Sequence, residues 1–213
     1  MKKNIVSVPR SGQHMLERSL RFYHQQINLE FHYCEYYGCC KSRPCKINKS
    51  AYQKDHDLKV TSSKNISIPT NEKFLFLYRE NLLQQLESSF RYELVNRKVL
   101  KDSNMKIGYH DEFTRDYFKK FVSNPKFINY YKVIYKKYLN KKRNNVFCIE
   151  YDNFVLNFSD IFEKILIFFE VPIDKKLILK TEEFIKPILI HRISKNDEYY
   201  DELNDFVNNL VKT

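Results

Sequence analysis

The chain has 213 residues, enough for one domain with a substantial core, and its 17 Phe and 16 Tyr supply the apolar mass for one. Only three Gly and six Pro argue against a fibrous or loop-rich protein. The formal charge of +11 suits an anionic cofactor, an acidic glycan or nucleic acid, with lysines that merely solvate the surface as the simpler explanation. No apolar run has the length of a signal peptide or of a membrane span, so we expect a cytoplasmic protein.

The first apolar run, residues 5–8, predicts a buried strand that breaks at Pro9 and Gly12 and passes into a helix. Such a turn directs the free N–H groups and the positive dipole end of the helix at one point, which favours a phosphate. Arg10 adds a planar cation, and Ser11 and His14 add further donors. The Walker pattern G-x-x-x-x-G-K-[ST] is absent, so the sequence does not predict an ordinary ATP or GTP loop. A purely structural turn is the alternative.

Four of the five cysteines lie close together in the sequence: Cys34, Cys39, Cys40 and Cys45. A reducing compartment would keep them as thiols or give them to a metal. Their spacing lacks the paired C-x-x-C motifs typical of zinc sites, so we expect free thiols packed among tyrosines. A structural zinc site is the alternative.

Two further apolar runs, residues 74–78 and 146–149, predict parallel strands buried on both faces. Arg79 follows the first run, where open α/β sheets place ligand-binding groups, although a surface ion pair is its alternative role. A helix with an apolar face comes next and carries Ser88 and Ser89. Tyr151 follows the second run.

The remaining pattern is helical. We expect two helices between residues 111 and 140, divided at 123–125, and a core helix at 158–169 that Pro172 ends. Asp174 and Asp197 are candidate N-caps of two more helices. The whole chain, 1–213, is therefore predicted to be a single α/β domain with a central, mainly parallel sheet and helices on both faces.

Taken in chain order, four motifs resemble those of sulfotransferases that use 3′-phosphoadenosine 5′-phosphosulfate (PAPS). They are Pro9-Arg10-Ser11-Gly12, Lys54-Asp55-His56, Arg79 with a following serine, and Glu150-Tyr151-Asp152-Asn153-Phe154. This resemblance implies a three-layer fold of the P-loop-containing nucleotide hydrolase type. It also implies a set of PAPS-binding residues: Arg10, Ser11, Gly12, Gln13 and His14 for the 5′-phosphosulfate, Arg79 with Ser88 or Ser89 for the 3′-phosphate, and Tyr151 for the adenine side. Arg192 and Lys195 are similar to the closing Arg-Lys-Gly loop of the family, without its glycines.

The implied reaction is transfer of a sulfuryl group to an acceptor hydroxyl, of a carbohydrate or a small molecule, with no metal required. His56 would be the general base, assisted electrostatically by Lys54 and Arg10. The segment 28–50 would help line the acceptor pocket, or else be an ordinary surface loop. Because the chain is short for the family, the acceptor site should be compact or completed by a second copy of the chain in a homo-oligomer.

Two other functions compete with this one. A P-loop-type nucleotide or small-molecule kinase would share the first turn, but the chain lacks the loop lysine and a clear set of carboxylates for Mg²⁺. A basic nucleic-acid-binding module would explain the charge, but not the buried strands that end at Arg10 and Arg79. We therefore expect no nucleic-acid partner.

Overall fold

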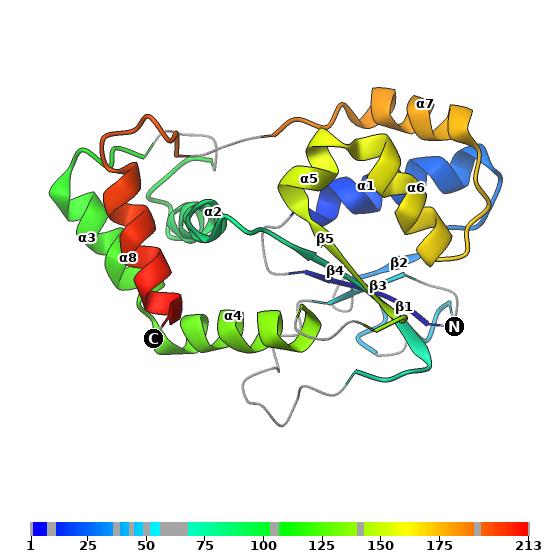
Figure 1. The fold of residues 1–213 in the computed structure, drawn as a ribbon, viewed down its shortest axis with the longest axis horizontal. Helices are drawn as coiled ribbons and strands as arrows, with labels where there is room; N and C mark the ends of the chain where they lie inside the picture. Colours follow the sequence, from blue (N-terminus) through cyan, green and yellow to red (C-terminus); the bar gives the residue numbers. More distant parts are fainter. Residues whose placement is uncertain are drawn as a thin grey trace.

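A five-stranded parallel sheet lies at the centre of the computed structural model, which describes residues 2–7, 12–35, 39–42, 45–48, 52–55, 68–102, 107–139, 143–189 and 193–212. The strand order is β2-β3-β1-β4-β5 (Figure 1). The strands are β1 (Lys2–Ser7), β2 (Tyr33–Cys34), β3 (Tyr52–Asp55), β4 (Glu72–Tyr78) and β5 (Val146–Glu150). Every pairing is parallel, which confirms the predicted sheet.

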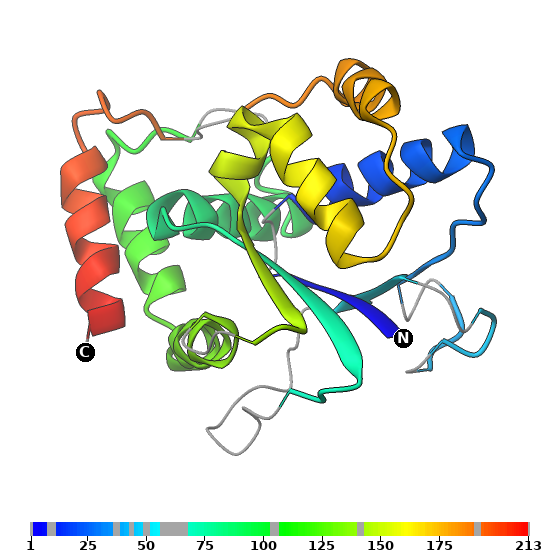
Figure 2. The ribbon, with the colours of Figure 1, turned by 45° about the vertical axis from the view of Figure 1, so that its right-hand side comes forward.

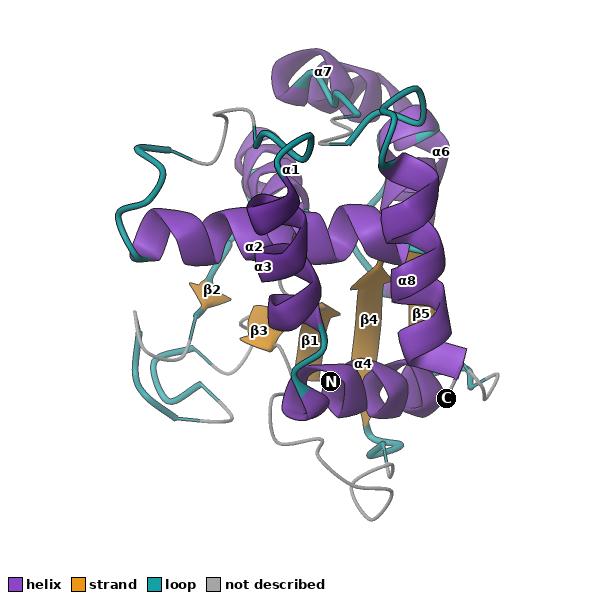
Figure 3. Cartoon of the chain, turned by 90° about the vertical axis from the view of Figure 1, so that its left-hand side faces the viewer, coloured by secondary structure: helices purple, strands orange, loops and turns teal. Residues whose placement is uncertain are grey.

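Helices cover both faces of this sheet (Figures 1 and 2). One layer contains α1 (Gln13–Gln26), α5 (Tyr151–Leu156), α6 (Phe158–Phe168) and α7 (Lys175–Ile185). The other contains α2 (Leu82–Asn96), α3 (Glu112–Val122), α4 (Pro125–Tyr138) and α8 (Tyr200–Lys212), which lie in front of the strands in Figure 3. None of the helices in the described ranges is both long and apolar enough to cross a bilayer.

The central strands are apolar throughout because successive side chains enter two different cores. Phe74 and Phe76 of β4 pack with α2, α3, α4 and α8. Leu75 and Leu77, which alternate with them, pack with α1, α5, α6 and α7. A run without polar positions therefore marks a strand with a helix layer on each side, as the sequence predicted.

The predicted helix boundaries hold except near the C-terminus. Helix α3 ends at Val122, with Ser123 as its C-cap, and α4 begins at Pro125; the Asp174 carboxylate accepts the N–H groups of Lys176 and Leu177 in the first turn of α7. The prediction that Asp197 caps the last helix is wrong, because α8 begins only at Tyr200. The Asp197 side chain instead accepts the N–H of Tyr199 in the turn before α8, and its backbone carbonyl accepts the N–H of Tyr200.

Candidate functional site at the carboxyl edge of the sheet

Three strand-to-helix turns meet at the carboxyl edge: β1 to α1, β4 to α2 and β5 to α5. Strand β4 lies between the other two, with Val6 paired to Phe76 and Phe76 to Cys148. Since all three strands run in the same direction, the residues that follow them are brought to one edge. Gly12, Arg79 and Tyr151 occupy these turns.

The first contact at this edge joins the outer two turns. Gly12, the residue before α1, has φ of 77°, in the left-handed region that favours glycine. A methyl group at this position would lie only 1.9 Å from Cε2 of Tyr151, the first residue of α5. The tyrosine ring therefore covers the start of α1 at a distance that only glycine allows.

Arg79, from the middle turn, lies against the same tyrosine. Its guanidinium carbon is 4.3 Å from the centroid of the Tyr151 ring, a cation–π contact, and the residue is only 7% exposed. Its Nε atom is 3.9 Å from Oδ1 of Asp152, within ion-pair range but too far for a hydrogen bond. Among the described residues neither of these two atoms has a hydrogen-bond partner. A buried cation with an open donor is costly unless an anion pairs with it.

The backbone around Arg79 is held by neighbouring elements. Tyr135 of α4 donates from its hydroxyl to the Arg79 carbonyl at 2.9 Å. Burial raises the pKa of Tyr135, so the hydroxyl stays protonated as a donor. Glu150 accepts N–H groups from Glu80 at 3.4 Å and from Asn153 at 2.6 Å, which ties the turns after β4 and β5 together. These hydrogen bonds fix the backbone of the turn that carries the Arg79 guanidinium.

The start of α1 has no side-chain cap among the residues described. The Gly12 carbonyl accepts the N–H groups of Met15 and Leu16, so those of Gln13 and His14 have no acceptor within the helix. The Gln13 side chain is buried and donates to the Ile5 carbonyl at 3.0 Å, which leaves its backbone N–H as the group available to a ligand. His14 is exposed in the same turn. Arg10 and Ser11 lie outside the described residues.

The two candidate serines of α2 have different surroundings. Ser89 is buried, and its hydroxyl donates to the Gln85 carbonyl one turn back at 3.1 Å. Ser88 is half-buried. The hydroxyl of Ser89 is therefore already committed to its own helix, an observation the sequence could not supply.

Lys54, a predicted catalytic residue, lies in β3, which is adjacent to β1. The last residue of that strand, Asp55, pairs with Val6, so β3 ends beside the start of the β1–α1 turn. The Lys54 ammonium is 2.9 Å from a carboxylate oxygen of Glu35. His56 lies outside the described residues, directly after Asp55.

Ile193, the residue after Arg192, is anchored on α2. Arg192 lies outside the described residues, but the next residue, Ile193, is hydrogen-bonded at both its backbone groups to the side chain of Gln84. Sequence reasoning missed Gln84. The signal that could have found it is a glutamine beside Leu83 on the buried face of an otherwise apolar helix.

An open pocket of about 380 Å³ adjoins Arg79 at the same edge. Aromatic and aliphatic side chains from α2, α4 and β4 form most of its wall. It is lined by Tyr78, Arg79, Glu80, Leu82, Tyr135, Leu139 and Asn208.

No protein-family profile and no curated protein sequence matches the chain. Solved structures do match. A retinol dehydratase in complex with androsterone and the inactive cofactor PAP (3′,5′-bisphosphoadenosine) is 12% identical, with a TM-score of 0.59, covering 99% of this chain and 79% of the other. The mouse sulfotransferase SULT7A1 complexed with PAP is 14% identical, with a TM-score of 0.58, covering 92% of this chain and 68% of the other. The retinol dehydratase complex with retinol and PAP is 13% identical, with a TM-score of 0.57, covering 99% of this chain and 81% of the other. The three-layer fold expected from the sequence is confirmed.

Proposed function

We propose that this chain, which has the sulfotransferase fold, is a PAPS-dependent sulfotransferase that transfers a sulfuryl group to an acceptor hydroxyl. The observation that carries the proposal is Arg79, a buried cation with an open donor, stacked on the tyrosine that covers the start of α1. Two anion sites on neighbouring turns, one at α1 and one at Arg79, match a nucleotide with phosphates on both its 5′ and 3′ positions. An ordinary adenosine phosphate would fill only the first.

In this proposal the turn before α1 holds the 5′-phosphosulfate through Arg10, Ser11, His14 and the backbone N–H groups of residues 12–14. Arg79 holds the 3′-phosphate, and Tyr151 lies beside the adenosine. Ser88 is the better second ligand for the 3′-phosphate, because the Ser89 hydroxyl is bound to Gln85. Arg192 would approach the same phosphate from the segment anchored at Ile193.

The reaction requires a base and a stabilised leaving group. As the acceptor oxygen bonds to sulfur, His56 would take the hydroxyl proton, and the bond from sulfur to the bridging phosphate oxygen would break to release PAP. Arg10 and Lys54 would stabilise the negative charge on that oxygen; guanidinium stays charged, so Arg10 acts electrostatically and not as an acid. The ion pair of Lys54 with the half-exposed Glu35 is of a weak kind, so it does not prevent Lys54 from turning to the leaving group.

The acceptor is proposed to be a hydroxyl-bearing carbohydrate or small molecule. Support for a small molecule comes from the similar retinol dehydratase, whose solved complexes contain androsterone or retinol. Incubation with radiolabelled PAPS and separate pools of sugars, phenols, lipids and peptides would identify the class.

The proposal is tested by thermal shift with PAP, AMP and ATP. At about 100 times its dissociation constant, PAP should stabilise the chain by roughly 2.7 kcal/mol, and AMP and ATP should do so much less at equal concentration. Arg79→Ala should remove the preference for PAP over AMP. Arg97→Ala, which changes an exposed arginine just after α2, should not. Equal stabilisation by ATP and PAP would contradict the proposal and favour the kinase alternative.

A further inference from the structure

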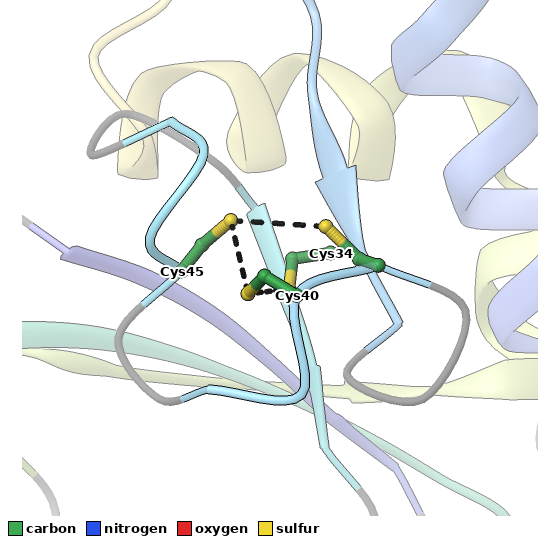
Figure 4. Close-up of side chains that lie close together, drawn as sticks. Cys34, Cys40 and Cys45 are labelled. Atoms are coloured by element: carbon green, nitrogen blue, oxygen red, sulfur yellow. Dashed lines mark hydrogen bonds between the residues drawn. The ribbon is translucent and has the colours of Figure 1, made fainter.

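Four cysteines converge at the edge of the sheet furthest from β5. Cys34 ends β2, and Cys39, Cys40 and Cys45 follow in the segment that leads to β3. Figure 4 shows Cys34, Cys40 and Cys45 close together. Their four sulfur atoms all lie within 4.8 Å of one another. Cys40 is 3.9 Å from Cys34 and 3.7 Å from Cys45, and Cys39 is 3.9 Å from Cys45, measured between sulfur atoms.

These separations fit a single tetrahedral metal ion. With zinc–sulfur bonds of about 2.3 Å, the edges of a regular tetrahedron of sulfurs are about 3.8 Å long. A disulfide would need sulfurs about 2.05 Å apart, so the measured distances do not describe a bonded pair. The sulfurs are thus grouped as ligands of one small ion would be.

The described residues around the four sulfurs include few other apolar side chains. Among the residues that the structure describes, the apolar cluster at this edge consists of the four cysteines, with Cys34 and Cys45 buried and Cys39 and Cys40 packed against them. Parallel neighbouring strands are usually joined through a helix, but the described parts of the connection from β2 to β3, residues 39–42 and 45–48, contain none. The thiols themselves contribute little apolar surface toward ordering such a connection. A metal ion would supply that order directly.

We propose that Cys34, Cys39, Cys40 and Cys45 bind one structural zinc ion as thiolates. Binding would release the thiol protons to solvent, and the four sulfurs would fill the tetrahedral coordination sphere, which leaves no open position for catalysis. The site replaces the expectation of free thiols packed among tyrosines. The proposed ligand set has no C-x-x-C pair, because Cys34 comes from a strand, the adjacent Cys39 and Cys40 come from the turn beside it, and Cys45 follows five residues later.

Hydrogen-bond donors surround the sulfurs. The Nε2 atom of His32 is 3.4 Å from the sulfur of Cys39 and 3.6 Å from that of Cys45, and the Lys46 backbone N–H donates to Cys40 at 3.4 Å. Such donors offset the negative charge of a four-thiolate site and orient its ligands. His32 is therefore assigned as an outer partner of the cluster and not as a ligand.

The experiment measures metal in the full chain, purified under reducing conditions without chelator. Elemental analysis should find one zinc per chain. Cys40→Ser and Cys45→Ser should each lose it, whereas Cys148→Ser should retain it. Cys148 is the matched control, because it lies in β5 and donates from its thiol to the Tyr138 carbonyl. His32→Gln should also retain the zinc.

If the cysteine variants fail to fold, the wild-type chain provides a second test. Titration with a mercurial should release one zinc as four thiols react, and cobalt(II) exchanged into the site should give the strong visible bands of tetrahedral thiolate coordination. Four freely reactive thiols in folded, metal-free protein would overturn the proposal, as would a disulfide within the cluster or bound iron in place of zinc. Loss of zinc in His32→Gln with retention in a cysteine variant would overturn the four-cysteine ligand set. None of these readouts depends on sulfotransferase activity.

Discussion

The side-chain amide of Gln84 holds the backbone of Ile193 at both ends. Its Nε2 donates to the Ile193 carbonyl, and its Oε1 accepts the Ile193 N–H at 3.4 Å. Gln84 is only 1% exposed and lies in the first turn of α2, shortly after Arg79. One buried glutamine therefore joins the segment next to Arg192 to the helix that begins beside the proposed 3′-phosphate site.

Gln84→Leu should weaken PAP binding about tenfold, a loss of about 1.4 kcal/mol, because the segment beside Arg192 loses its anchor. The same change should lower the free energy of unfolding by roughly 1–3 kcal/mol, since the backbone groups of Ile193 stay buried without their partner. Calorimetric titration with PAP and urea unfolding measure the two effects.

The control for this variant is Glu93→Gln, on the same helix in an exposed ion pair with Arg97. It should leave PAP affinity unchanged. If Gln84→Leu loses stability but binds PAP as tightly as the wild type, the anchor is structural only and the segment beside Arg192 does not contact the donor.

Gly12→Ala should lower both stability and PAP affinity. The new methyl group meets the Tyr151 ring, and a left-handed backbone at a non-glycine residue costs roughly 1–3 kcal/mol by itself. Tyr151→Ala in the same chain removes the collision but not the backbone strain. The double variant should therefore be more stable than the sum of the two single changes predicts, as urea unfolding of all four proteins would show. Simple additivity would mean that the ring does not cover Gly12 in solution.

The main strands could be predicted because burial on both faces makes their residues apolar at successive positions. Most helices could be predicted from their caps and their regularly spaced apolar residues. Residues 74–78 and 146–149 are apolar at nearly every position, and the Asp174 cap precedes a regular helix. The short strands β2 and β3 were not predicted, since residues such as Gln53 and Lys54 show no apolar run. Strand β3 pairs with β1, and β2 pairs in turn with β3, so their pairing is set by neighbouring strands and not by local sequence.

The candidate site was only partly predictable for a similar reason. Arg79 could be found because it follows a recognisable strand. The contact of Tyr151 with Gly12, the bonds from Gln84 to Ile193 and the convergence of the four cysteines all join residues that only the fold brings together. Spacing along the chain does not reveal such contacts.

His56→Ala should lower the rate of sulfuryl transfer by about 10² to 10⁴, the usual cost of losing a general base. PAP affinity should change little, because in the proposed mechanism His56 acts on the acceptor hydroxyl and not on the nucleotide. Initial rates and calorimetric titration separate the two effects. The exposed His110, changed in the same way, is the control. Near-wild-type turnover in His56→Ala would remove His56 from the mechanism and direct attention to Asp55 or Asp57.

The last prediction concerns His24 of α1, which is 3% exposed. Its Nδ1 is 2.8 Å from the Leu20 carbonyl of the same helix, and its Nε2 is 3.2 Å from the hydroxyl of Tyr52 in β3. Burial lowers the pKa of His24, the hydrogen bond to the Leu20 carbonyl raises it in part, and the nearby Lys3 lowers it further, so the net effect of folding is to disfavour the protonated imidazole. As the pH falls below about 6.5, the unfolded chain binds this proton before the folded chain does, and stability should fall until the pH reaches the lowered pKa of the folded state. The melting temperature should therefore decline less steeply from pH 7 to pH 5 in His24→Gln than in the wild type or in the exposed-site control His110→Gln. Parallel declines in all three would show that His24 does not contribute to acid sensitivity.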